Sequence, residues 1–201
     1  MKRIIINKKL VADEIRRFLG PVDLSDEVLS KLFKIATIEK VKKHALILTP
    51  GAQDDYLGLV LKGMIQIYHY LDNKLVSDFF AGEGCGFFDV DSFLTGEPSE
   101  VTIETLEPSV IAKFDRKQFF QLCDEDPRID LIYRKILQYG ITMTNERLDS
   151  LLHDSAEEKY ISLENRMPGL TSRISSINIS SYIGVTQETL CRIKSKQGIL
   201  F

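Results

Sequence analysis

The chain has 201 residues, of which 44% are apolar and 27% charged, and its formal net charge is −3 at pH 7, as in a soluble globular protein. No apolar run approaches the ~18 residues of a membrane span. The N-terminus carries too short an apolar core for a secretory signal. Cys85, Cys123 and Cys191 are too few and too widely spaced for a disulfide framework or a zinc site. We therefore expect a cytoplasmic protein with free thiols, one large domain and one small one.

The charge is distributed unevenly along the chain. Residues 159–201 contain six basic and two acidic side chains, which gives +4, so the other 158 residues carry −7. A basic segment attached to an acidic body favours a DNA-binding C-terminal part, because phosphates attract the one and repel the other. The alternative is chance, since +4 over 43 residues is modest.

The N-terminal part predicts helices followed by β-hairpins. A short amphipathic helix is expected over 9–19, and Ser25 with two following carboxylates starts a second that runs to Ile35. The apolar pattern then takes a period of two, which is typical of strands. The expected strands are 38–48, 56–61, 64–71, 75–80, 101–106 and 110–114, with a helical turn at 89–94 and a short helix from Asp115. Such short, evenly spaced strands favour a β-sandwich or barrel.

A long helix is predicted after these strands. It begins at Pro127 and runs to about Ser150, with an extension to Lys159 left open. Steps of three and four separate its apolar positions, as in a coiled-coil seam: Ile129, Ile132, Ile136, Tyr139, Met143, Leu148, Leu151 and Leu152. We expect this helix to form a homodimer. The alternative is that it only covers its own β-domain.

The segment 175–196 predicts two short helices joined by a tight turn. Gly184 can take the positive φ of such a turn, and Thr186 is a suitable N-cap for the second helix. Five apolar residues face inward at helical spacing: Ile179, Ile183, Val185, Leu190 and Ile193. This is the spacing of a helix-turn-helix, whose second helix enters the DNA major groove. An ordinary helical hairpin is the alternative.

The whole arrangement resembles the Crp/Fnr family of bacterial transcription regulators. The strand 56–61 with Lys62-Gly63, the segment Ser155–Tyr160 and the segment Ile183–Ile193 are similar to motifs of that family. The resemblance implies an α+β fold with an N-terminal β-roll or jelly-roll sensor domain (1–123), a dimerisation helix (124–158) and a helix-turn-helix domain (159–201). It also implies that Gln187, Glu188 and Arg192 contact base edges.

From this resemblance we expect a homodimer that binds double-stranded DNA, responds to an unknown small-molecule effector and contacts RNA polymerase, with no membrane association and no cofactor. The candidate DNA-binding residues are Arg173, Thr186, Gln187, Glu188, Arg192, Lys194 and Lys196. The family usually has a β-hairpin wing after the recognition helix, and this chain stops too soon for one. Phosphate contacts would then come from residues such as Arg173, Lys194 and Lys196.

The segment expected to hold an effector departs from the family pattern. Members that bind cyclic AMP pair an arginine with the cyclic phosphate, and here that position falls on Ser99, beside Glu100. No Arg or Lys lies between Asp78 and Lys113. A buried phosphate needs a charge-assisted partner, so we expect no tight binding of cyclic AMP. The candidate effector residues are Gly82, Glu83, Asp89, Ser99 and Glu100.

Other chemistry has little support in the sequence. His44, His69 and His153 have no metal-ligand spacing, and no catalytic signature or phosphate-binding loop appears, so we do not expect an enzyme. Asp54-Asp55 and Asp89 with Asp91 are interpreted as solvated turn carboxylates. The competing hypothesis is a ligand-binding or protein-interaction module whose DNA-binding domain is degenerate.

Overall fold

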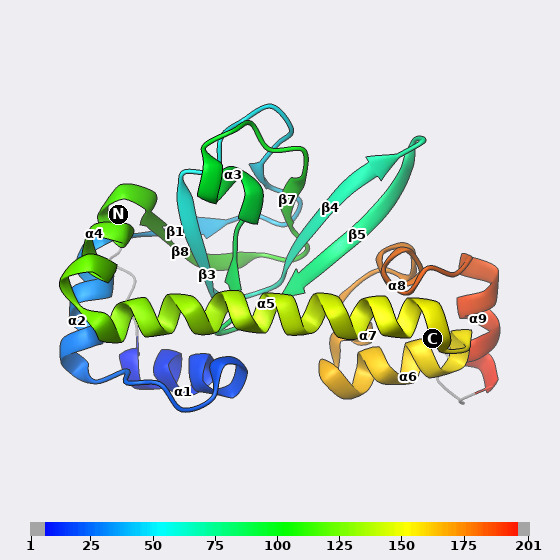
Figure 1. Cartoon of the computed structure of the whole chain (residues 1–201). Coiled ribbons are helices and arrows are strands. Elements are labelled where there is room, and N and C mark those ends of the chain that lie inside the picture. The colour runs from blue at the N-terminus through cyan, green and yellow to red at the C-terminus, as the bar shows by residue number, and fades with distance from the viewer. Residues whose placement is uncertain (1–6, 197–201) are drawn as a thin grey trace. The chain divides into compact units, whose positions relative to one another are not determined.

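The computed structural model describes residues 7–196, which form two compact units (Figure 1). The first unit contains the described residues up to Ile67 together with Phe80–Gly140. The second contains Tyr68–Phe79 and the described residues from Ile141 onward. The helices are α1 Lys8–Leu19, α2 Asp26–Ile35, α3 Val90–Thr95, α4 Arg116–Glu125, α5 Pro127–His153, α6 Ala156–Arg166, α7 Leu170–Arg173, α8 Ser176–Ile183 and α9 Gln187–Lys196. The strands are β1 Ala36–Val41, β2 Leu46–Leu48, β3 Tyr56–Lys62, β4 Ile65–Leu71, β5 Lys74–Ala81, β6 Gly86–Phe87, β7 Thr102–Thr105 and β8 Ser109–Asp115.

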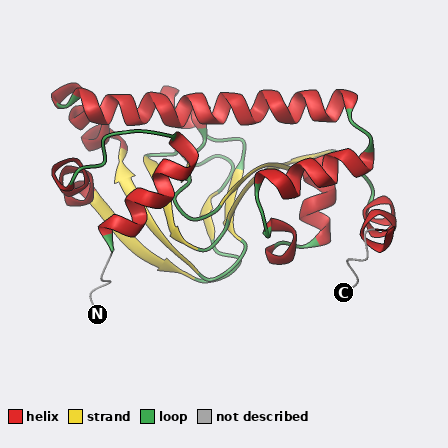
Figure 2. Cartoon of the chain, turned by 90° about the horizontal axis from the view of Figure 1, so that it is seen from below, coloured by secondary structure: helices red, strands yellow, loops and turns green. Residues whose placement is uncertain are grey.

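The strands form two four-stranded sheets. One has the order β1-β8-β3-β6 and the other β2-β7-β4-β5. The central strand β8 pairs antiparallel with β1, where Ala36 lies opposite Phe114, and with β3, where Leu59 lies opposite Ala112. Figure 2, coloured by secondary structure, shows the strands of the first unit as neighbouring yellow arrows. The period-two pattern favours a β-sandwich or barrel, and the observed arrangement is the β-roll that the family resemblance implies.

The core of the first unit lies between the strands and helices α1, α2, α4 and the first part of α5. Val28, Phe93, Ala112 and Ile129 are fully buried in it. Aromatic rings link α3 to α4 and α5, since the ring of Phe93 lies 5.4 Å from that of Phe120 and 6.5 Å from that of Tyr133. The short helix α3 is therefore anchored to the helices of the first unit.

The structure corrects the expected seam of the long helix. Ile129 and Ile132, expected at a dimer interface, are buried in the core of their own unit. For these residues the alternative interpretation, that the helix covers its own β-domain, is confirmed. The extension to Lys159 is wrong, because Ser155 starts a new helix with a capping box that pairs it with Glu158.

The strands also differ from the expected ones in two places. The strand expected over 38–48 is broken between Val41 and Leu46, where His44 has a φ of 60°. The two-residue strand β6 was not predicted at all, because two residues carry no periodicity. The bounds of the three predicted domains stay predictions; by compactness, the chain forms the two units described above. The expectations for the first six residues and for 197–201 fall outside the described residues.

Candidate nucleic-acid interface and ligand cavity

The predicted pair of short helices with a turn at Gly184 is confirmed as α8 and α9. Gly184 ends α8 with a φ of 67°, and its N–H donates to the carbonyl of Ser180. The hydroxyl of Thr186 accepts the N–H of Thr189 at 3.2 Å, which caps the start of α9 as expected. Ile179, Ile183, Leu190 and Ile193 are buried, and Val185 is half-buried. The apolar set thus fixes how α9 packs on α8.

The polar side chains of α9 lie on its outer face. Gln187, Glu188, Arg192 and Lys196 are exposed. The Arg192 guanidinium lies 3.5 Å from the hydroxyl of Thr189. These residues present donors and acceptors within one helical segment, which is the arrangement that base-edge recognition requires.

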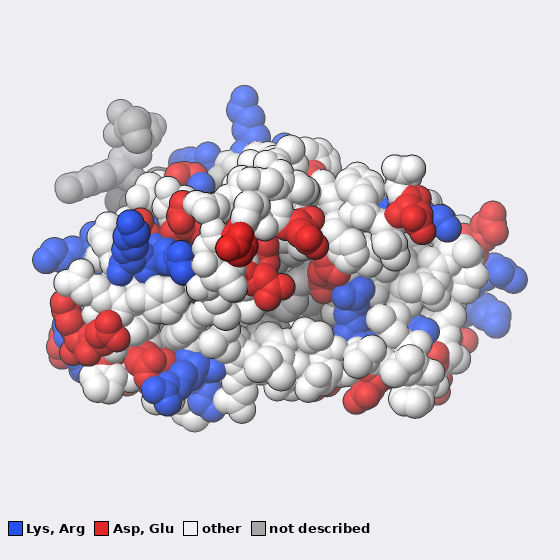
Figure 3. Space-filling model, turned by 45° about the horizontal axis from the view of Figure 1, so that its top comes forward, with Lys and Arg blue, Asp and Glu red and all other residues white. Residues whose placement is uncertain are grey.

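Two other residues predicted to contact DNA are less exposed than those on the outer face of α9. Lys194 is half-buried and its ammonium donates to the hydroxyl of Ser176 at 3.3 Å, while Arg173 is half-buried at the end of α7. On the face drawn in Figure 3, Lys and Arg side chains lie in small groups interspersed with Asp and Glu. That face therefore offers DNA no single broad basic surface.

The five predicted effector residues come from three separate stretches of the first unit, and none of them is among the residues that line the cavity described below. Gly82 and Glu83 lie in the turn after β5, where the Glu83 carboxylate accepts the N–H of Gly63 at 2.9 Å. Asp89 caps α3. Ser99 is buried and exchanges backbone hydrogen bonds with the loop before β3: its N–H donates to Ala52, and its carbonyl accepts the N–H of Gly51. Glu100 is exposed. Their role as effector ligands stays a prediction.

Asp54 corrects the expectation of a solvated carboxylate. Its side chain accepts the N–H of Asp89 at 2.7 Å and that of Tyr56 at 3.4 Å, and its own N–H donates to Ser92 at 2.9 Å. Only 7% of Asp54 is exposed, and this burial raises its pKa to about 6. Asp54 therefore ties the loop before β3 to the start of α3. The only local signal was an Asp two residues before a strand, a common turn position.

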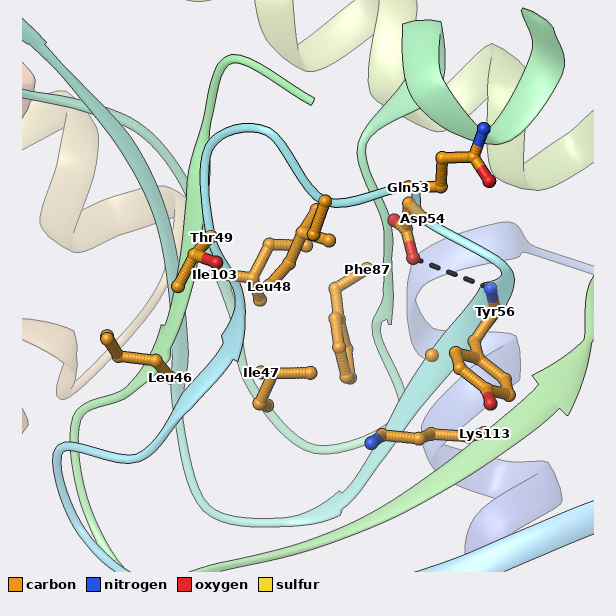
Figure 4. A pocket seen from close by; sticks show the side chains of 12 residues that line it. Leu46, Ile47, Leu48, Thr49, Gln53, Asp54, Tyr56, Phe87, Ile103 and Lys113 are labelled. Carbon is orange, nitrogen blue, oxygen red and sulfur yellow. Dashed lines mark hydrogen bonds between the residues drawn. The ribbon is translucent and has the colours of Figure 1, made fainter. Parts of the chain in front are cut away.

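A cavity of about 180 Å³ lies in the first unit next to this loop (Figure 4). Its walls are mainly apolar and come from β2, β3, β6 and β7: Leu46, Ile47, Leu48, Gly58, Phe87 and Ile103, with Asp54, Tyr56 and Lys113 as polar neighbours. The Phe87 ring packs so closely over Gly58 that an added methyl group would collide with it. A glycine in β3 is therefore a packing requirement here.

Two cations lie near the cavity and the segment 86–101. Lys113, which contributes to the cavity, forms an ion pair with Glu39 at 3.0 Å. Arg116 donates to the carbonyl of Leu94 at 2.9 Å, near the end of α3. Both cations already have protein partners. Sequence spacing could not reveal the position of Arg116, because it lies after the strand that follows this segment.

Between residues 7 and 196 there is no group of three His, Cys, Asp or Glu side chains that could hold a metal ion. Within the same range, no helix has the length and hydropathy needed to cross a membrane. The three cysteines are free, and burial raises the pKa of Cys85 to about 12.

Comparison with known proteins agrees with this geometry. Residues 38–126 match the cyclic nucleotide-binding domain family. A Pycsar effector protein of Pseudomonas aeruginosa, PaPycTIR, is 21% identical over 170 residues, which cover 84% of this chain and 49% of that protein. The chain thus spans about half the length of this relative.

Three solved structures share the fold. FixK2 from Bradyrhizobium japonicum has a TM-score of 0.72 at 18% identity, covering 83% of this chain and 88% of its own. The c-di-GMP-responsive regulator CLP of Xanthomonas campestris has a TM-score of 0.70 at 15% identity, covering 85% and 90%. A Crp/Fnr-family transcriptional regulator from Eubacterium rectale has a TM-score of 0.67 at 12% identity, covering 87% and 84%. The chain therefore has a β-roll of the cyclic nucleotide-binding fold followed by C-terminal helices, and the structures that share this fold include a regulator of the Crp/Fnr family.

Proposed function

We propose that this protein is a homodimeric, DNA-binding transcription regulator of the Crp/Fnr type. The observation that carries the proposal is the α8–α9 pair, in which a buried apolar set holds α9 while Gln187, Glu188 and Arg192 remain exposed on its outer face. An Arg guanidinium can pair bidentately with guanine O6 and N7 in the major groove. Glu188 can accept from a cytosine amino group. The fold of the neighbouring regulators supports the same assignment.

A stripe along α5 supports the dimer. Its members are exposed in the single chain and follow alternating steps of three and four residues: Leu131, Arg134, Gln138, Ile141, Asn145, Leu148 and Leu152. The leucines and Ile141 are 48% to 67% exposed, which is unusual for large apolar side chains on one helix face. Polar residues such as Asn145 within an apolar seam fix register in coiled coils. We assign this α5 stripe to the contact between two copies of the chain.

The effector, if the roll binds one, is not expected to be cyclic AMP. The segment 86–101 contains no Arg or Lys, and the nearby Lys113 and Arg116 already bond to Glu39 and Leu94. A cyclic phosphate in this segment would lie near Asp89 and Glu100 without a cation to balance it. The apolar walls of the cavity suit a small, weakly charged molecule better.

Selection of bound sequences from random duplex DNA by the purified protein tests the proposal directly. Arg192→Ala should leave the fold intact, because Arg192 lies outside the buried apolar set. The variant should lose about 1–3 kcal/mol of binding free energy at one base position, and its sequence preference at that position should relax.

Lys196→Ala is the matched comparison for a side chain that contacts phosphate only. It should weaken binding to all DNA sequences alike, and the slope of log affinity against log salt concentration should become shallower by about one. If the selection returns no preferred sequence, or if Arg192→Ala binds every duplex as the parent does, α9 is not a recognition helix.

One finding favours a second candidate. The match to PaPycTIR covers 84% of this chain and only 49% of that protein, so the same fold occurs within an effector protein that is longer than the matched part. In that case the chain would act as the sensing module of an effector system, and its output would be an effector activity, such as an enzymatic one, in place of transcription regulation. Sequence-independent or absent DNA binding, together with ligand binding in the roll, would favour this candidate.

A further inference from the structure

In the second unit, the residues Tyr68–Phe79 of the β4–β5 hairpin pack against α8. Figure 1 shows α8 alongside β5. Strand β5 is an edge strand of its sheet, so its outward backbone groups have no neighbouring strand to pair with. Such groups must find other partners when they are buried. The contacts that satisfy them come from α8 and from the second half of α5.

Ser181 of α8 takes the place of a neighbouring strand. Its hydroxyl donates to the carbonyl of Leu75 at 2.6 Å and accepts the N–H of Ser77 at 2.8 Å. Leu75 and Ser77 are two residues apart, so their outward groups lie on the same side of β5. The Ser77 hydroxyl adds a bond to the carbonyl of Asn178 at 3.3 Å. One helix residue thus satisfies a donor and an acceptor of the strand edge.

Arg147 of α5 joins the same three segments. Its guanidinium donates to the carbonyls of Ser77 at 2.7 Å, Asp78 at 3.2 Å and Tyr182 at 3.2 Å. It also lies over the Tyr182 ring, 4.5 Å from the centroid. The Tyr182 carbonyl is near the C-terminus of α8, where the helix dipole favours a cation. A lysine could not reach these three carbonyls at once, because its ammonium is a single point of charge.

None of these contacts of Ser181 and Arg147 involves α9. Ser181 and Arg147 bond to the hairpin and to α8, while Gln187, Glu188 and Arg192 of α9 stay exposed. Since the buried apolar set fixes α9 on α8, whatever holds α8 also sets the direction in which α9 points.

We propose that Arg147 and Ser181 are positioning residues that latch the α8–α9 pair onto residues 75–78 of β5 and so fix the direction in which α9 is presented to DNA. This inference rests on the proposed function, since it concerns how the same α9 is presented to DNA.

The test uses the full chain and two measurements. Ser181→Ala removes both bonds to the strand edge, and Ser181→Thr keeps a hydroxyl. Ser180→Ala is the matched control, because the Ser180 hydroxyl, one position earlier in α8, donates only to Ile177 of the same helix. Hydrogen exchange of the amides of residues 75–79 and of α8 reports the latch without DNA. Titration with a duplex chosen by the selection described above reports DNA affinity.

Ser181→Ala should speed exchange in both segments and weaken DNA binding about tenfold, the equivalent of one or two net hydrogen bonds. Arg147→Lys should do the same, whereas Ser181→Thr and Ser180→Ala should remain close to the parent. Unchanged exchange in Ser181→Ala overturns the latch. Faster exchange with unchanged DNA affinity overturns the positioning role. If the parent selects no DNA sequence, the proposed function fails and the positioning role with it, while exchange still decides whether the latch exists.

Discussion

Replacing Asp54 by asparagine should stabilise the protein at neutral pH and not at acidic pH. Burial raises the pKa of Asp54 from 3.8 to about 6, so the folded state holds this proton more tightly than the unfolded state does. As pH rises from about 4 to about 6, the carboxyl must ionise in a buried site, and the free energy of unfolding falls. A shift of about two units corresponds to a cost of up to about 3 kcal/mol above pH 6.

Asparagine removes that cost because it carries no charge and its amide oxygen can still accept the N–H of Asp89. Urea unfolding should therefore show Asp54→Asn to be more stable than the parent by up to about 3 kcal/mol at pH 7.5, with the difference vanishing near pH 4. The exposed neighbour supplies the control, Asp55→Asn, which should change little at either pH.

Other carboxylates titrate over the acidic range and must be separated from Asp54. Hydrogen bonds from Arg128 and Lys31 lower the pKa of Glu27 to about 2 and hold that of Asp126 below its usual range. These groups stabilise the fold above their unfolded pKa values, and that contribution is lost as pH falls. Their effect is common to parent and variant, so it cancels in the difference. A difference that is independent of pH, or a variant less stable than the parent at pH 7.5, would refute the assignment of a buried charge to Asp54.

Three further predictions follow from the roll and from α5. Millimolar cyclic AMP should not raise the melting temperature, whereas a ligand at a hundred times its dissociation constant would add about 2.7 kcal/mol, so a clear rise would contradict the argument from missing cations. Sedimentation at micromolar concentration should give about twice the 22.9 kDa mass, and Ile141→Glu with Leu148→Glu should give folded monomers; a dimer that survives both changes would exclude the α5 stripe. Gly58→Ala should lower the free energy of unfolding by about 1–3 kcal/mol, because the added methyl group collides with the Phe87 ring. In the double variant with Phe87→Leu, urea unfolding should show part of this loss recovered, whereas additive effects of the two substitutions would argue against the contact.

The elements that the sequence predicted well are those fixed by local chemistry. The turn at Gly184 and the cap at Thr186 each depend on a few adjacent residues. The start of α6 was equally local, since Ser155 and Glu158 form a capping box, but the helical period on both sides hid the break.

The features that sequence reasoning missed depend on residues far apart in the chain. Ile129 and Ile132 have the spacing of a coiled-coil seam, and only the packed roll shows that they face inward. Asp54 appears as an ordinary turn residue until α3 folds over it. Ser181 lies 106 positions from its partner Leu75, and Arg147 lies 70 positions from its partner Ser77, so no local pattern could link them.

The polar groups of the segment 86–101 are largely bonded to the protein itself. The N–H of Asp89, at the start of α3, is taken by the Asp54 carboxylate, and the backbone of Ser99 is taken by Gly51 and Ala52. An anionic ligand seeking these donors would have to displace an internal carboxylate and break bonds that each contribute about 1 kcal/mol net. Because no Arg or Lys within that segment would offset the loss, an anion gains little there. The same bonds fix the loop before β3 on the start of α3, so displacing them would also loosen the packing of that loop in the roll.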